Sequence, residues 1–286
     1  MGEKRRMKEN LCMYGENDRR AAEVSPAEQR AIVEKMVKTP INIFMAVMKI
    51  FVIILSALAI VGLVKYTVDD IIPLFKYSSM SRFITILAVI SLAVNAVTAI
   101  QLIFGILVGV GVCRTVFSAS AKGARMAATY LKRTVVLTII IVVLNLIINL
   151  INTIDGNDTG VPVFLISTAL VVGVLVLYCK YMNGWATVLE DAALRIEGMN
   201  VYSLPVSVSI KGPAITMAVL MGLSSILTIV ADAELIRNMR ILGINRSTAE
   251  IASIISMILA TLYFVFSAVA YGAYYKYCEK LHDSNR

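Results

Sequence analysis

Long stretches without a charged side chain are the feature that most limits how this chain can fold. Five windows contain no Asp, Glu, Lys or Arg, and each is 20 to 31 residues long. About 20 apolar residues are enough to cross a bilayer as an α-helix. A sixth window, 39–64, contains a single charged residue, Lys49. We therefore expect an all-α integral membrane protein with six transmembrane helices, at about 41–64, 84–113, 134–153, 161–181, 213–232 and 251–275.

The composition agrees with a membrane location. Only 16% of the residues are charged, and the mean hydropathy is +0.79. Soluble domains carry about 25% charged residues, so this chain has too few to cover a surface in water. Residues 1–40 are charged throughout and lack the apolar centre of a cleavable signal peptide. We expect the first span to act as an uncleaved insertion signal.

Lys and Arg are concentrated in alternate loops. Loops rich in these residues stay in the cytoplasm. We therefore expect three hairpins in the plasma membrane, with both termini cytoplasmic. The segments assigned to the cytoplasm, 1–38, 114–133, 180–211 and 276–286, hold 9, 5, 3 and 3 Lys or Arg, and the alternate loops, 65–82, 155–158 and 232–250, hold 3, 0 and 3.

This topology divides the chain into a cytoplasmic N-terminal segment (1–38), a six-helix transmembrane domain (39–276) and a short tail (277–286). The first segment carries 9 basic and 7 acidic residues. This near balance is unlike a polyanion-binding arm, so we expect no nucleic-acid partner. All four cysteines fall on the reducing cytoplasmic side, where thiols stay free. They are Cys12, Cys113, Cys179 and Cys278.

Three segments outside the spans are amphipathic. Ser25, Pro26 and Glu28 fit the start of an elbow helix over 25–38, lying at the inner membrane surface. The segments 114–133 and 184–198 also have one apolar face. Such helices either float at the interface or dock a soluble partner. In the first of them we expect four basic residues to contact anionic lipid headgroups: Lys122, Arg125, Lys132 and Arg133.

The even-numbered spans end alike. Each has two small residues four positions apart, followed by a cysteine near a basic residue. Two explanations stay open, a threefold-repeated two-helix unit or the usual composition of a membrane interface. In either case small residues allow helix backbones to approach closely. The candidate packing pairs are Gly105 and Gly109, Ala169 and Gly173, and Ala268 and Gly272.

Lys49 is the one ionisable side chain well inside a span. Either it extends towards the headgroups or it has a role in the bundle interior. Other polar residues recur on one face of several spans. They either line a path for a neutral or anionic solute, or form hydrogen bonds between helices, each worth about 0.6 kcal/mol. The sets are Asn42, Lys49 and Ser56; Asn95, Thr98 and Gln101; Asn145 and Asn149; and Ser225, Thr228 and Asp232.

Residues for catalysis are scarce. No Asp or Glu lies in the core of a span, and His282 is the single histidine. The chain contains neither GxxxxGK[ST] nor GxGxxG. We therefore expect no enzyme, no metal and no cofactor.

These observations favour a membrane transport component, a permease subunit or a small-solute transporter without its own nucleotide-binding site. A cytosolic ATPase or another membrane subunit would then be its partner. The alternative is a non-catalytic scaffold or regulatory protein that recruits cytosolic or membrane partners. Fold-level analogy does not decide between them.

Overall fold

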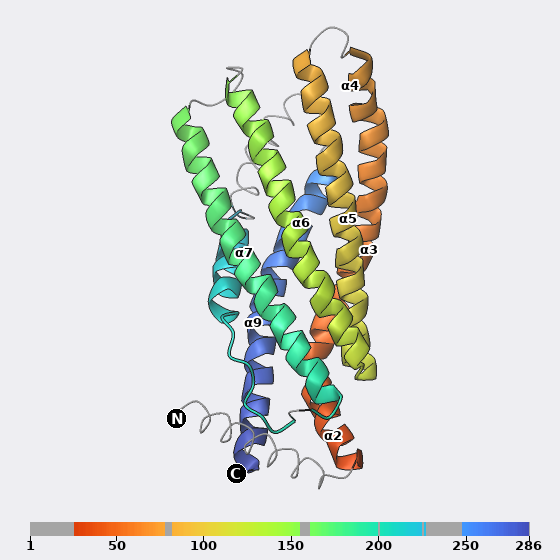
Figure 1. The fold of residues 1–286 in the computed structure, drawn as a ribbon, viewed down its shortest axis with the longest axis vertical. Helices are drawn as coiled ribbons and strands as arrows, with labels where there is room; N and C mark the ends of the chain where they lie inside the picture. The colour runs from red at the N-terminus through yellow and green to blue at the C-terminus, as the bar shows by residue number, and fades with distance from the viewer. Residues whose placement is uncertain are drawn as a thin grey trace, which may run out of the picture.

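The computed structural model describes residues 26–77, 82–154, 161–199, 201–224, 226 and 248–285. Within these ranges the regular structure is entirely helical, as predicted (Figure 1). Residues 211–224 form a further helical segment between α7 and α9. The helices are α2 (Pro26–Val37), α3 (Pro40–Tyr66), the π-helix η1 (Thr67–Ile71), α4 (Ile72–Tyr77), α5 (Arg82–Ser118), α6 (Ala121–Ile154), α7 (Val161–Ile196) and α9 (Thr248–Ser284).

Five helical stretches in the described part of the chain are long and apolar enough to cross a membrane. They contain most or all of five of the predicted spans. The other predicted span, 213–232, begins in the helical segment 211–224 and continues outside the described residues. The five stretches are Pro40–Ile71, Thr85–Ser118, Ala121–Ile151, Phe164–Ile196 and Ile258–Ser284.

The helices α3, α5, α6 and α7 lie side by side, each packed against the next to form a layer (Figure 1). Helix α9 crosses behind this layer and contacts α3 and α2. The end of α2, the turn between α5 and α6, and the C-terminal ends of α7 and α9 all lie at one end of the bundle, which we name the α2 end (Figure 1).

The elbow between α2 and α3 is held by local hydrogen bonds. Thr39 has extended backbone angles and caps α3, its hydroxyl accepting a hydrogen bond from the Asn42 N–H at 3.3 Å. Pro40 begins α3, where its missing N–H has no consequence. The Asn42 side-chain amide donates to the carbonyls of Met36 and Val37 at 3.2 Å each. Asn42 thus satisfies carbonyls that the end of α2 leaves free.

The prediction of separate interfacial helices at 114–133 and 184–198 is wrong. Helix α5 continues to Ser118, the chain turns at Ala119 and Ser120, and α6 begins at Ala121. Helix α7 runs without a break through the whole of 184–196. Charged residues do not stop a helix, and neither segment contains a proline. The predicted apolar faces exist, but they pack against other helices of the bundle: Ala124, Ala128, Leu131 and Ala192 are all buried.

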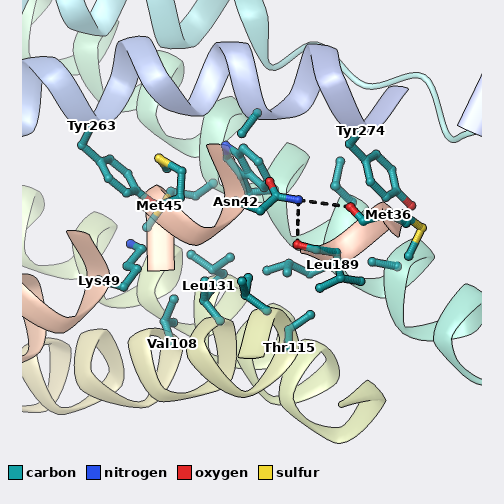
Figure 2. A pocket seen from close by; sticks show the side chains of 18 of the residues that line it. Met36, Asn42, Met45, Lys49, Val108, Thr115, Leu131, Leu189, Tyr263 and Tyr274 are labelled. Carbon is teal, nitrogen blue, oxygen red and sulfur yellow. Dashed lines mark hydrogen bonds between the residues drawn. The ribbon is translucent and has the colours of Figure 1, made fainter. Parts of the chain in front are cut away.

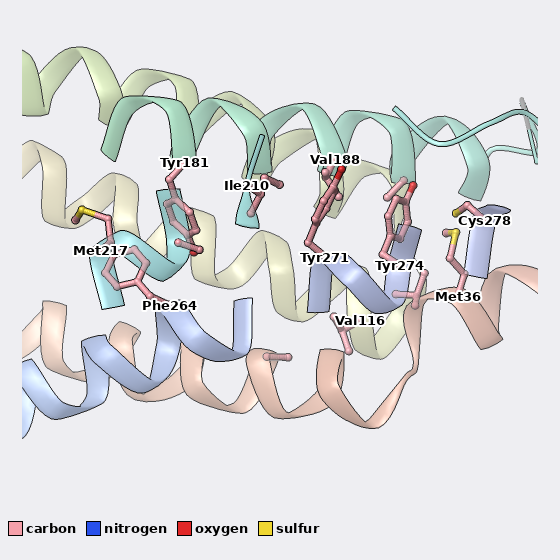
Figure 3. Close-up of a cluster of buried hydrophobic side chains, with 14 of the residues drawn as sticks. Met36, Val116, Tyr181, Val188, Ile210, Met217, Phe264, Tyr271, Tyr274 and Cys278 are labelled. Carbon is pink, nitrogen blue, oxygen red and sulfur yellow. The ribbon is translucent and has the colours of Figure 1, made fainter. Parts of the chain in front are cut away.

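The buried core lies near the α2 end. Its main cluster joins α2, α7, the segment 211–224 and α9 (Figure 3). Further away, large apolar side chains are exposed, for example Leu58 (63%), Val61 (68%) and Leu170 (66%). At 1.5 Å per residue, α5 is roughly 55 Å long, against about 30 Å for the hydrocarbon layer of a bilayer. The helices therefore have enough length to cross the bilayer and still form a packed bundle beyond it.

Backbone strain differs between two turns at this end. Gly198 has a φ of +85° and ends α7, with Met199 N–H donating to Leu194 O and Gly198 N–H to Arg195 O. This is the Schellman arrangement, in which glycine is favoured. The turn after α5 instead places an alanine, Ala119, at a φ of 45°.

We therefore expect opposite effects of two substitutions. Gly198→Ala should lower the free energy of unfolding by about 1–2 kcal/mol, because a Cβ is disfavoured at this φ and would clash with Gln29 Nε2. Ala119→Gly should be neutral or stabilising by up to about 1 kcal/mol, because relief of strain is partly offset by chain entropy. Thermal unfolding in mild detergent measures both. Equal shifts of the same sign would contradict the assigned backbone angles.

Candidate functional site

A cavity lies among the helices near the α2 end, lined by side chains of α2, α3, α5, α6, α7 and α9 (Figure 2). Its volume is about 100 Å³. Most of its lining is apolar, including Met45, Val108 and Leu189. We name it the Lys49 cavity. Its polar lining residues are Asn42, Lys49, Thr115, Tyr181, Trp185, Tyr263 and Tyr274.

Lys49 points from α3 towards Tyr263 of α9 (Figure 2). Its Nζ lies 4.3 Å from the centre of the Tyr263 ring, a cation–π distance. Among the described residues, its ammonium takes part in none of the ion pairs. The contact with Tyr263 therefore favours the interpretation in which Lys49 has a role in the bundle interior.

Three other polar groups of the lining are already satisfied. Asn42 caps α2, as described above, and the Thr115 hydroxyl donates to the Gly111 carbonyl of its own helix at 2.8 Å. The Tyr274 hydroxyl donates to Asp191 Oδ2 at 2.5 Å. None of these groups offers Lys49 a charge partner.

Two further polar groups of the lining make no hydrogen bond of good geometry with the described residues. They are Trp185 Nε1 and the Tyr181 hydroxyl, which lies close to the Tyr263 and Ser267 side chains. Buried polar groups are nearly always hydrogen-bonded, so each orphan needs an explanation. The two residues are four apart on α7 and therefore share a face of that helix. The Tyr181 ring packs on Phe264, whose neighbour Tyr263 contacts Lys49.

A buried ion pair lies next to the cavity and contacts one of its lining residues, Tyr274. Arg195 and Asp191 are 1% and 7% exposed, and Arg195 Nε donates to Asp191 Oδ2 at 2.9 Å. The guanidinium also donates to the carbonyls of Val201 and Ser203 at 2.9 and 3.1 Å. This network joins α7 to the segment after it and, through Tyr274, to α9. Because Asp191 is paired with Arg195, its charge does not neutralise Lys49.

The remaining polar residues predicted for a solute path do not gather in this cavity. Asn95 donates to Thr67 Oγ1 at 3.1 Å, and Gln101 donates to Thr138 Oγ1 at 2.8 Å. Both bonds join neighbouring segments, as expected for hydrogen bonding within the bundle. Thr98 bonds the Val94 carbonyl of its own helix. Ser56 is buried beside Gly105, whereas Asn145 and Asn149 are exposed on α6. Ser225, Thr228 and Asp232 lie outside the described residues.

The predicted packing pairs differ in their surroundings. A Cβ added to Gly109 would lie 2.7 Å from Ile53 of α3, so α3 and α5 approach closely there. Ala268 and Gly272 lie on the part of α9 that faces the core and Lys211. Ala169 and Gly173 are exposed, and a Cβ on Gly173 would meet nothing within 4 Å. A close backbone approach between Gly111 and Gly123 was not among the predicted pairs.

The four basic residues predicted to contact lipid headgroups are exposed on α6. Two of them pair with acids of α7, Arg125 with Glu197 at 2.5 Å and Lys132 with Glu190 at 2.7 Å. Arg133 lies over the Tyr130 ring. Only Lys122 has no such contact in the described part of the chain.

No family model, curated protein or solved structure matches this chain. In the described ranges, no group of three or more His, Cys, Asp or Glu side chains is placed to hold a metal ion. The site therefore has to be interpreted from its own geometry.

Sequence reasoning found Lys49 and Asn42 but missed the aromatic groups of the cavity. Tyr181 and Tyr263 lie in predicted spans, and Trp185 lies in the predicted amphipathic segment 184–198; aromatic side chains are usual at a membrane interface. One signal was present: the single tryptophan follows Tyr181 by four residues, so both rings share one face of a helix.

Proposed function

We propose that this chain is a membrane transport component that binds a small solute in the Lys49 cavity. The observation that carries the proposal is an ammonium group inside an apolar bundle, without an ion-pair partner among the described residues. A lysine inside an apolar span is costly and is a functional hypothesis by default. The cavity also has the usual form of a ligand site, mainly apolar with a few converging polar groups.

In this proposal the chain crosses the plasma membrane six times, as three hairpins. The α2 end of the bundle then lies in the cytoplasm. The distribution of Lys and Arg supports this orientation. We propose no catalytic activity, because the span cores carry no acid and the single histidine lies near the C-terminus. In this proposal the lipid bilayer surrounds the helices. Lys122, which is exposed, is the residue best placed to contact an anionic headgroup.

A transport component should open its binding site to both sides of the membrane in turn. We therefore expect Met45→Cys, in a chain lacking the four native cysteines, to react with a membrane-impermeant methanethiosulfonate from both sides. Met45 lines the cavity and is 7% exposed. The measurement is labelling in right-side-out and inside-out vesicles. Val135→Cys is the matched control, because Val135 is also 7% exposed but does not line the cavity, and it should stay unlabelled.

The same vesicles test the orientation. Asp69→Cys, in η1 just after α3, should label only in right-side-out vesicles, and Ser284→Cys, at the end of α9, only in inside-out vesicles. The reverse pattern would contradict the proposed topology. Labelling of Met45→Cys from only one side of the membrane, under all conditions, would contradict the transport proposal.

A scaffold role is the second candidate, and one observation favours it. A polar groove with a volume of about 450 Å³ lies between α2 and the ends of α5 and α7. Native mass spectrometry of the protein extracted from its own host in mild detergent distinguishes a permease subunit from a scaffold by the partner that each retains. A stoichiometric cytosolic ATPase would support a permease subunit, and a different stoichiometric protein would support the scaffold. A solitary chain would remove both and leave a self-contained transporter.

A further inference from the structure

We infer that the Lys49 cavity selects a small organic monoanion, a carboxylate carried on an apolar body, with about ten non-hydrogen atoms in all. This inference rests on the proposed function and adds the chemical class of the solute. It follows from three properties of the cavity: its charge, its free hydrogen-bond donors and its size.

The cavity carries a positive charge that no acid among the described residues compensates. Lys49 has no acidic partner among the described residues, and the nearby Asp191 is occupied by Arg195 and Tyr274. One lysine matches one negative charge. A cationic solute would be repelled, and a neutral solute would leave the ammonium with only the Tyr263 ring as its partner.

The free polar groups of the cavity are suited to an acceptor. The Lys49 ammonium and the Trp185 indole N–H only donate hydrogen bonds, and the Tyr181 hydroxyl is also able to donate. Asn42, Thr115 and Tyr274 already use their donors within the protein. A carboxylate has two acceptor oxygens and no donor. It would therefore accept a hydrogen bond from Trp185 Nε1, which has no partner among the described residues, and one from Tyr181 Oη, whose neighbours Tyr263 and Ser267 offer no bond of good geometry.

The size and lining of the cavity limit the rest of the ligand. A cavity needs about 10–15 Å³ to hold one water molecule. The Lys49 cavity, at about 100 Å³, therefore has room for on the order of seven to ten atoms of that size. The remaining lining is aliphatic or aromatic, with Met45, Val112 and Leu189 as examples. A phenyl ring or a short alkyl chain fits these surroundings, whereas a sugar or an amino acid would leave its own polar groups unpaired.

The single tryptophan lines this cavity and reports on its contents. We expect 4-bromobenzoate to quench the fluorescence of Trp185 saturably in the full chain in mild detergent. Its uncharged analogue 4-bromobenzamide has nearly the same shape and should bind about tenfold more weakly or worse, since a hydrogen bond to a charged group is worth about that factor. The cation 4-bromobenzylammonium should not quench saturably.

Substitutions of Lys49 test whether this residue causes the preference for the anion over the amide. Lys49→Met should remove the preference for the anion and leave binding of 4-bromobenzamide intact, which also shows that the cavity has folded. Lys49→Arg should keep the preference. Lys132→Met is the matched control, because it removes a lysine from the pair with Glu190 outside the cavity, and it should change neither probe.

Equal binding of the anion and the amide would overturn this inference and leave the proposed function in place. A preference that survives in Lys49→Met would overturn it as well. Absence of saturable quenching by all three probes would also overturn it, while the two-sided labelling of Met45→Cys still decides separately whether the cavity belongs to a transport component.

Discussion

Replacing Arg195 by alanine should destabilise the protein by about 3–5 kcal/mol, as expected when one partner of a buried ion pair is removed. Arg195 is 1% exposed, and its guanidinium bonds Asp191 and the carbonyls of Val201 and Ser203. Without it, Asp191 stays buried as an unpaired carboxylate and two backbone oxygens lose their donor. The apparent melting temperature in mild detergent measures the effect.

Lys132→Ala is the control for this prediction. The pair of Lys132 with Glu190 also involves α7, but the two side chains are 50% and 46% exposed. Exposed pairs contribute about 0–1 kcal/mol, so this change should be small. The double variant Asp191→Leu with Arg195→Leu should recover part of the loss, because no charge is left buried. Recovery would be incomplete, since Tyr274 and the two carbonyls remain without their partner. Similar shifts for Arg195→Ala and Lys132→Ala would show that the buried network is not formed.

Replacing Gly123 by alanine should destabilise the protein by about 1–3 kcal/mol, the usual cost of overpacking. A Cβ at this position would lie 2.8 Å from the Gly111 carbonyl oxygen and 3.0 Å from the Thr115 backbone nitrogen. These are backbone atoms, so no flexible side chain is available to move away. The helices α5 and α6 would have to separate next to their connecting turn. Thermal unfolding in detergent measures the loss.

Gly173→Ala is the matched control, because a Cβ there would meet nothing within 4 Å. Alanine is the better helix former by about 1 kcal/mol, so this variant should be neutral or more stable. The pair of variants also tests the small-residue pattern noted in the sequence. A loss at Gly173 equal to that at Gly123 would indicate a packing partner for α7 that the described residues do not include.

The candidate site illustrates where sequence reasoning stops. Lys49 was identified because a lysine inside an apolar span is rare and costly. The sequence left open whether it extends to the membrane surface, since this depends on what surrounds the side chain. The structure places Tyr263, 214 positions later in the chain, against its ammonium. Asn95 and Gln101 show the reverse case, because their regular spacing suggested a path and each instead bonds a neighbouring segment.

The sequence by itself determined the class of protein and where its long apolar helices run. This was possible because the length of an apolar stretch and the positions of charges are local properties, and a bilayer responds to them directly. The tertiary structure alone decided which faces of the helices meet. An apolar face packs equally well against lipid or protein, so the faces of 114–133 and 184–198 did not show that they belong to a helix bundle. Nor did an i,i+4 spacing show that Asp191 and Arg195 are buried, because burial depends on helices that come later in the chain.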